Sequence, residues 1–203
     1  MFLYIKILLQ FVSMSSHLRS RGIMEIVESD TVDRILEQWA EKRPDLNASP
    51  MGVFGRLSRA KAVLDRSLSR TFGRFGLHSW EFDVLATLRR NGEPYSLTPT
   101  ELYRSMMLSS GAMTNRLDRL EGRGLVRRSR DPRDRRGVRI TLTEEGLELI
   151  ERAVEAHVEG EEKMLGSLSE EDRELLAGLL RKLLISMEVA ECGETEPTGV
   201  PRE

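Results

Sequence analysis

"SSGAMTNRLDRLEGRGLVRR", residues 109–128, has the spacing of an amphipathic helix that runs into a short strand. At about 100° per residue, Met113, Leu117 and Leu120 share one side of this helix, which we expect to face a core. The opposite side is small and polar, and bulk there would hold a helix away from base edges in a major groove. These features predict a DNA recognition helix. Its groove-facing and flanking residues are Gly111, Thr114, Asn115, Asp118 and Arg119.

The first turn of this helix supplies a second kind of DNA contact. Ser109 or Ser110 is expected to cap the helix, and backbone N–H groups at the positive end of a helix can bind phosphate. Such contacts position a protein on the duplex, whereas side chains at base edges specify the sequence. The DNA contacts predicted from this segment are Ser109, Ser110, Gly111, Thr114, Asn115 and Arg119.

A charged turn follows between two strand-like runs. "LVRRS" (125–129) and "VRITL" (138–142) flank "RDPRDRRG" (130–137), which predicts a β-hairpin with an arginine-rich tip. Arginine side chains are long and permanently charged, so they can reach a narrow minor groove while neighbouring aspartates orient them by bidentate pairing. A solvated Arg/Asp loop is the alternative interpretation. The DNA contacts predicted from the tip are Arg130, Arg133, Arg135 and Arg136.

Two marked helices precede the recognition helix. Ser79 is the predicted cap of "WEFDVLATLRR", which an Asn-Gly pair ends. In "LTPTELYRSMM", Thr98 and Glu101 form a capping box around Pro99, whose missing N–H costs nothing at the first helical position. Helix, helix, helix, hairpin is the order of a winged helix-turn-helix. We therefore predict a mainly α fold with a small β-hairpin wing, whose DNA-binding core spans about 77–142.

Further helices flank this core. Residues 29–46 are predicted to form an extra N-terminal helix, capped at Ser29 or Asp30. "NASPMGVFGRL" (47–57) is typical of a linker, and a long helix with a 3.6-residue period is expected from Val53 to Phe72. Two more helices are expected after Thr143.

The last predicted helix carries a double apolar stripe. A stripe this wide exceeds what a surface helix on one small domain needs, which favours a dimer interface. Completion of a core within the chain is the alternative. The DNA-binding core and its dimerisation helices together would span 50–190, and the polar tail at 191–203 is predicted to be disordered. The stripe consists of Leu175, Leu176, Leu179, Leu180, Leu183 and Leu184.

Composition excludes several classes of function. The 203 residues carry a net charge of −2, but residues 104–139 hold eleven arginines and four acids, a local charge of +7 that suits an anionic partner. The single cysteine, Cys192, allows no disulfide framework and fits a reducing cytoplasm. The histidines lack metal-ligand spacing, and neither a nucleophile triad nor a Gly-rich phosphate loop occurs. We therefore predict a cytoplasmic protein that is not an enzyme and holds no metal or cofactor.

The N-terminal stretch "MFLYIKILLQFV" (1–12) is apolar but falls short of the roughly 20 residues that a spanning helix needs, and Lys6 interrupts it. It also lacks a convincing signal-peptide cleavage site. We therefore expect no membrane association. Met14 and Met24 are candidate natural starts, and residues 1–28 are expected to form an extension that the native protein need not contain.

Five motifs together resemble the MarR family of dimeric bacterial transcription regulators. They are "SWEFDVLATLRR", "LTPTEL", "SSGAMTNRLDRLEGRGLV", "DPRDRRG" and "ITLTEEG", and the resemblance runs from about Val53 to Val189. It implies a homodimer in which the first long helix and the last two form the interface. Two recognition helices would then bind a pseudo-palindromic duplex with half-sites about one helical turn apart.

The chain is also similar to a narrower branch, the urate-responsive regulators related to PecS and HucR, which have an extra N-terminal helix with a tryptophan. This resemblance implies ligand contacts from Trp39, Asp83, Arg116 and Arg128. Arg116 lies beside the core edge of its helix, where it could bind an anion bidentately, while Trp39 could stack on a flat ring. Asp83 could accept from ring N–H groups or repel an anion.

Each ligand assignment has a structural alternative. Asp83 lies opposite the apolar side of its own helix, a position typical of a solvated acid. Trp39 could anchor the added helix to the core, and Arg128 could pair with a phosphate. The assignment of these residues to a ligand therefore depends on the resemblance.

The function expected from these features is that of a sequence-specific repressor, released from double-stranded DNA by urate or another small anionic purine. A regulator of the same family that responds to a phenolic or aromatic acid is one alternative. Another is a dimeric interaction protein without specific DNA binding, which a shallow salt dependence of DNA affinity would reveal. A thiol-based peroxide sensor fits poorly, because Cys192 lies in an acidic tail.

Overall fold

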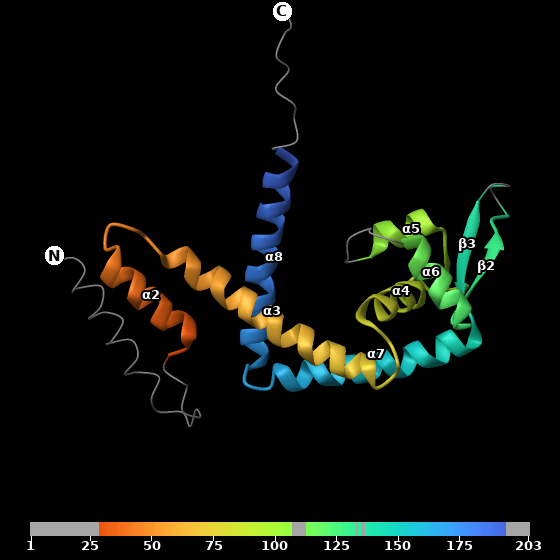
Figure 1. Cartoon of the computed structure of the whole chain (residues 1–203), viewed down its shortest axis with the longest axis horizontal. Helices are drawn as coiled ribbons and strands as arrows, with labels where there is room; N and C mark the ends of the chain where they lie inside the picture. The colour runs from red at the N-terminus through yellow and green to blue at the C-terminus, as the bar shows by residue number, and fades with distance from the viewer. Residues whose placement is uncertain (1–28, 107–112, 133, 135–136, 194–203) are drawn as a thin grey trace, which may run out of the picture. The chain divides into compact units, whose positions relative to one another are not determined.

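The computed structural model describes residues 29–106, 113–132, 134 and 137–193 (Figure 1). The chain divides into two units, residues 1–63 and 64–203. The predicted combination of helices with a small antiparallel sheet is confirmed. The described elements are α2 (Thr31–Lys42), α3 (Ser49–Gly73), α4 (Ser79–Arg90), β1 (Ser96–Leu97), α5 (Pro99–Ser105), α6 (Met113–Gly122), β2 (Val126–Arg130), β3 (Val138–Leu142), α7 (Glu144–Met164) and α8 (Glu170–Gly193).

In the first unit, charged side chains cap α2 and attach it to the start of α3. Asp30 accepts from the N–H groups of Val32 (2.6 Å) and Asp33 (3.1 Å), and Asp33 accepts from the N–H of Asp30 (2.7 Å). This capping box confirms the predicted helix start. Arg56 of α3 pairs with Asp30 at 2.9 Å and with Asp33 at 2.6 Å.

The prediction of a linker at residues 47–57 is wrong, because α3 already begins at Ser49. Pro50 stands in the first turn, where its missing N–H costs no helical hydrogen bond. Gly55 has low helix propensity but permits close packing of α2, since a Cβ there would lie 3.2 Å from Val32 Cγ1. Packing between the two helices therefore outweighs the local signal for a loop.

The second unit contains a three-stranded antiparallel sheet in the order β1-β3-β2. The predicted hairpin is confirmed by the pairing of β2 with β3, whose register places Arg130 opposite Val138. Strand β1 (Ser96–Leu97), which pairs with β3, was not predicted. A strand of two residues is too short to show an alternating pattern, so only its pairing defines it.

The starts of α2 and α5 match the predicted caps, and the start of α4 differs from the predicted cap by one residue. Thr98 Oγ1 accepts from the N–H of Glu101 (3.2 Å), and the Glu101 carboxylate accepts from the N–H of Thr98 (2.8 Å), which confirms this capping box. The N-cap of α4 is His78, whose N–H donates to the Glu81 carboxylate (2.8 Å), and not Ser79 as predicted.

Glycines in the left-handed region follow two of these helices. Gly92 (φ 78°) lies just beyond α4 and Gly124 (φ 72°) just beyond α6, where a residue with a Cβ would be strained. Gly92 matches the end predicted for α4 from its Asn-Gly pair. The predicted caps of α6, Ser109 and Ser110, lie outside the described residues.

One hydrophobic core joins α4, α5, α6 and α7 to the sheet. Phe72, near the end of α3, extends this core by stacking on Phe82, with 4.1 Å between ring centroids. His157 of α7 meets Phe82 edge-on at 5.0 Å. The aliphatic members that are almost completely buried are Val84, Leu85, Leu88, Leu102, Leu117, Leu120, Ile140 and Ile150.

The start of α7 lies against the turn between α6 and β2. Thr143 Oγ1 accepts from the N–H of Gly146 (3.0 Å) and donates to the carbonyl of Gly124 (2.6 Å). The N–H of Thr143 donates to the carbonyl of Leu125 (3.2 Å). These bonds connect the DNA-binding core directly to the long C-terminal helices.

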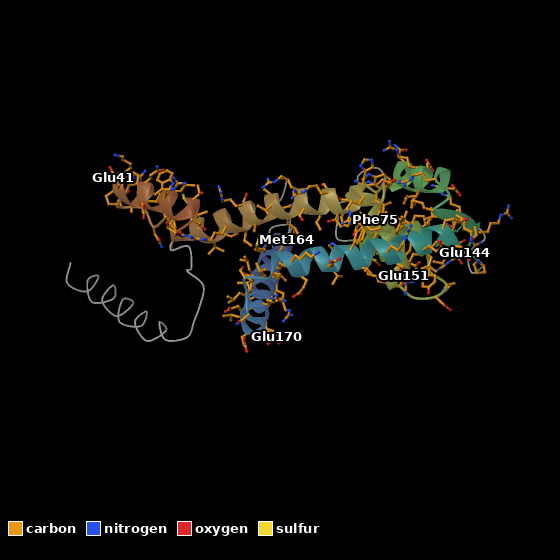
Figure 2. All side chains as sticks on the ribbon, turned by 90° about the horizontal axis from the view of Figure 1, so that it is seen from below. Glu41, Phe75, Glu144, Glu151, Met164 and Glu170 are labelled. Atoms are coloured by element: carbon orange, nitrogen blue, oxygen red, sulfur yellow. The ribbon has the colours of Figure 1, made fainter. Side chains whose placement is uncertain are left out.

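Figure 2 labels Glu144 and Met164, which bound α7, and Glu170, where α8 begins. Helix α8 continues to Gly193, so its backbone extends three residues into the tail predicted at 191–203. Residues 194–203 lie outside the described part of the chain. Among the helices that are described, none is both long and apolar enough to cross a membrane.

Candidate DNA-binding surface and effector site

The side of α6 assigned to the DNA groove is exposed. Leu117 and Leu120 are buried, whereas Thr114, Asn115 and Arg119 are exposed. This burial pattern confirms the predicted orientation of the helix. The remaining predicted contacts of this segment, Ser109, Ser110 and Gly111, lie outside the described residues.

An ion pair between a buried carboxylate of α4 and a partly exposed arginine holds the turn after α6 against α4. The Glu81 side chain is only 3% exposed, and its Oε1 lies 2.7 Å from Arg123 Nη1. Its second oxygen accepts the N–H of His78. Because a buried carboxylate is costly without partners, this pair specifies where the turn after the recognition helix lies. The sequence analysis did not single out either residue.

Arg139 fixes the base of the wing. Its Nη1 lies 3.2 Å from Asp131 Oδ2, its Nη2 donates to the carbonyl of Ser96 (2.7 Å), and its Nε donates to Ser96 Oγ (3.1 Å). Asp131 was expected to orient the arginines of the tip, whereas it pairs with Arg139, for which no role was predicted. The role of Arg139 could not be predicted because its partner Ser96 belongs to β1, the strand that was not predicted.

A tight turn presents the wing tip. The N–H of Asp131 donates to the carbonyl of Gly137 (2.9 Å), and the N–H of Gly137 donates to the carbonyl of Asp134 (2.8 Å). A Cβ at Gly137 would lie 2.9 Å from Asp131 Cβ, so glycine is required for this approach. Arg130 is exposed at the end of β2. The other predicted tip contacts, Arg133, Arg135 and Arg136, lie outside the described residues.

Arg128, predicted to bind the ligand, pairs with two carboxylates of α6. Its Nη1 lies 2.6 Å from Asp118 Oδ1 and 3.0 Å from Glu121 Oε2. It also borders a depression of about 470 Å³. Its predicted ligand contact would require an exchange of these ion pairs. The other residues that line the depression are Pro99, Thr100, Tyr103, Thr114, Leu117 and Val138.

Asp83 of α4 and Arg116 of α6 each present a buried polar atom without a hydrogen-bond partner within the described structure: Asp83 Oδ2 and Arg116 Nη1. Buried polar groups in proteins are nearly always paired, so two opposite orphans in one unit are a candidate binding site. Asp83 is half-buried, unlike the solvated acid that periodicity favours. Arg116 Cζ lies 5.6 Å from the ring centroid of Trp80, which the sequence analysis did not select.

The predicted ligand residues thus have different surroundings. Arg116 lies close enough to Asp83 for its positive charge to lower the pKa of that carboxyl. Arg128 belongs to the ion-pair network on the exposed side of α6. Trp39 lies on α2 in the first unit, with 37% of its surface exposed. The ligand contacts of all four residues stay predictions.

Known proteins resemble this chain in sequence and in fold. A model of the MarR family matches residues 77–138. The transcriptional regulator PecS of Dickeya dadantii (strain 3937) is 45% identical over 152 residues, which cover 75% of this chain and 92% of PecS. The chain belongs to the MarR family. It is accordingly a DNA-binding transcription regulator and not an enzyme.

Solved structures of MarR regulators share the fold. Sco3205 of Streptomyces coelicolor, in complex with DNA, is 27% identical with a TM-score of 0.62, covering 68% of this chain and 88% of Sco3205. BpsR of Bordetella bronchiseptica, whose DNA binding is regulated by 6-hydroxynicotinic acid, is 28% identical with a TM-score of 0.58. That match covers 64% of this chain and 91% of BpsR.

Burial and nearby arginines determine the electrostatics of Asp83 in this MarR regulator. Burial raises the pKa of the Asp83 carboxyl, and the positive charges of Arg90 and Arg116 offset only part of that increase. Arg90 is itself engaged, since its guanidinium donates to the carbonyl of Ser105. A carboxylate that is desolvated but not hydrogen-bonded destabilises the folded state when it ionises.

We predict that Asp83→Asn increases the free energy of unfolding at pH 7. The folded-state pKa of Asp83 lies above the ordinary value of 3.8, so ionisation opposes folding at neutral pH, and the amide removes that penalty. The gain should be complete above the folded-state pKa and should disappear as the pH falls through it towards 3.8. Urea unfolding of both proteins at pH 7 and pH 4 measures the difference.

Glu148→Gln is the matched control for this substitution, because Glu148 is an exposed acid of α7. We expect its stability to follow the parent at both pH values. A gain for Asp83→Asn that is the same at pH 4 as at pH 7 would contradict the assigned cause.

Proposed function

We propose that this MarR regulator is a cytoplasmic repressor that binds a pseudo-palindromic operator as a homodimer and releases it when a small anionic ligand, urate or a related purine, binds. The observation that carries the proposal is the pair of unpartnered buried atoms, Asp83 Oδ2 and Arg116 Nη1. Arg116 belongs to the same helix as the exposed groove face. A ligand that pairs with these atoms therefore acts on the recognition helix itself.

The surface of α6 and the wing supports the DNA-binding part of the proposal. Thr114, Asn115 and Arg119 form a polar, exposed face on a helix whose other side is buried. Arg130 places positive charge on the adjacent hairpin. The DNA complex of Sco3205, a relative with the same fold, shows that such a scaffold can bind a duplex.

The exposed apolar side of α8 supports the homodimer. Leu175 is 62% and Leu179 53% exposed in the single chain, and both belong to the predicted leucine stripe. Contiguous apolar surface of this kind is characteristic of interfaces. A symmetric dimer would cover the stripe with its own copy and would present two recognition helices to two half-sites.

Release requires that the ligand discriminates between two states of the dimer. A ligand with equal affinity for both states shifts nothing, so it must bind the DNA-incompetent state more tightly by a few kcal/mol. In our proposal this preference arises from Arg116, whose movement towards the ligand would turn α6 and change the spacing of the two recognition helices.

A response to an aromatic acid is the second candidate, which BpsR supports through its regulation by 6-hydroxynicotinic acid. Thermal unfolding of the purified protein with urate, xanthine, benzoate and salicylate separates the two. A ligand at 100 times its Kd stabilises by about 2.7 kcal/mol, which corresponds to roughly 5–10 °C in Tm. We expect the purines to give the largest shift; a shift with the acids alone would favour the second candidate.

We predict that Asn115→Ala and Arg119→Ala weaken operator binding in different ways. If Asn115 contacts a base, its loss should cost about 1–3 kcal/mol of binding free energy and relax specificity at one position of the operator. If Arg119 contacts a phosphate, its loss should weaken binding to all sequences alike and lower the salt slope by about 1. Electrophoretic mobility shifts on operator and scrambled duplexes, over a range of salt concentrations, measure both effects.

Arg152→Ala on the exposed surface of α7 removes the same charge elsewhere and serves as control. Unchanged operator affinity in both α6 variants would contradict the assigned groove face. A shallow salt slope for the parent protein would instead favour the interaction protein without specific DNA binding.

A further inference from the structure

Trp80 is the aromatic residue next to the two unpartnered atoms. It precedes Asp83 by one helical turn, so the two side chains share a face of α4. The Arg116 guanidinium lies over its ring at 5.6 Å. Trp80 is only partly buried, and it packs against the edge of the core. An aromatic ring, an acceptor and a donor therefore meet between α4 and α6.

The two orphan atoms define which ligand chemistry completes the site. Asp83 Oδ2 can only accept when ionised, and Arg116 Nη1 can only donate. A ligand that satisfies both must offer an N–H to the carboxylate and an acceptor, preferably anionic, to the guanidinium. Planar heterocycles that combine a ring N–H with a deprotonated oxygen or nitrogen have both groups. A benzoate has no such donor.

The contact between Arg116 and Trp80 holds the cation in position without using Nη1. A guanidinium over an indole is stabilised by the ring quadrupole, so its orientation is restricted before any ligand arrives. A site whose groups are oriented in advance loses less entropy on binding. Trp80 therefore both orients Arg116 and offers apolar surface to a flat ring.

We propose that Trp80 forms the aromatic wall of the effector site, and that this site selects planar anionic heterocycles with a ring N–H over aromatic acids that lack one. The inference rests on the proposed function, because it assigns a residue and a ligand class to the same site. Its structural alternative is a tryptophan that only packs on the core edge, where it also stacks on His78 with 6.4 Å between ring centroids.

Tryptophan fluorescence tests the contact directly, because the chain contains only two tryptophans, Trp39 and Trp80. Both tryptophans emit in the full-length parent and only Trp39 emits in Trp80→Phe, so the difference between these two proteins isolates the emission of Trp80. We expect titration with urate to quench this emission with saturation, and benzoate to bind about 10- to 100-fold more weakly, since it leaves Asp83 unpaired. Absence of quenching of the Trp80 emission by urate, in a parent protein that urate stabilises, would overturn the placement of Trp80.

Substitution of Trp80 separates a wall of the site from a core anchor. We expect Trp80→Leu to lower urate affinity at least tenfold, measured by calorimetry, while operator affinity stays within twofold of the parent; Trp80→Phe should restore most of the urate affinity. Equal urate affinity in Trp80→Leu and parent would overturn the inference and leave the proposed function intact. A parent protein that no purine stabilises would overturn both.

Discussion

Leu179→Asp is expected to convert the regulator into a monomer that no longer binds its operator specifically. Leu179 lies within the exposed stripe of α8, and in a symmetric dimer each copy would place one buried carboxylate in the interface, so the penalty counts twice. Loss of the second half-site should reduce operator affinity about 1,000-fold or more, towards the level of non-specific binding. Analytical ultracentrifugation and mobility shifts report the two effects independently.

Arg181→Asp is a stringent control for this substitution. Arg181 is exposed on the opposite side of α8, and its replacement changes the charge of the helix more than Leu179→Asp does. We expect the control protein to remain dimeric and to bind the operator within a few-fold of the parent. A dimeric Leu179→Asp protein with normal affinity would show that the interface lies elsewhere.

Gly146→Ala, which adds one methyl group, is expected to lower the free energy of unfolding strongly. A Cβ at this position would lie 2.0 Å from the carbonyl oxygen of Leu125 and 2.9 Å from its carbonyl carbon. Both are backbone atoms, so a rotamer change cannot relieve the clash and α7 must separate from the start of β2. We expect a loss of about 3 kcal/mol, or roughly 6–12 °C in Tm for a chain of this size.

The matched control for this substitution is Gly160→Ala in the same helix. A Cβ there would lie 3.8 Å from Thr71 Oγ1, an ordinary van der Waals contact. Replacement of a glycine inside a helix should stabilise by about 0.5–1 kcal/mol. Calorimetric melting of both variants checks the pair, and a Gly146→Ala protein as stable as the parent would show that the close approach is not maintained in solution.

Local sequence signals were sufficient for most of the secondary structure. The period of Leu117 and Leu120 oriented α6, and the capping box of Thr98 and Glu101 located α5. These signals succeed because helix periodicity and caps depend on residues only three or four positions apart. They failed in the segment 47–57, where glycines that indicate a loop instead permit close packing between α2 and α3.

Some features of the functional sites could be predicted from the sequence, and others required the tertiary structure. The sequence alone was enough to predict the winged helix, the exposed groove face of α6, and the concentration of arginines in its wing. Only the tertiary structure paired β1 with β3, placed Arg139 between Ser96 and Asp131, and brought Trp80 to the side of Arg116. Periodicity is a property of neighbouring residues, whereas all of these contacts except that of Arg139 with Asp131 join residues more than thirty positions apart, and packing of the core decides which of them meet.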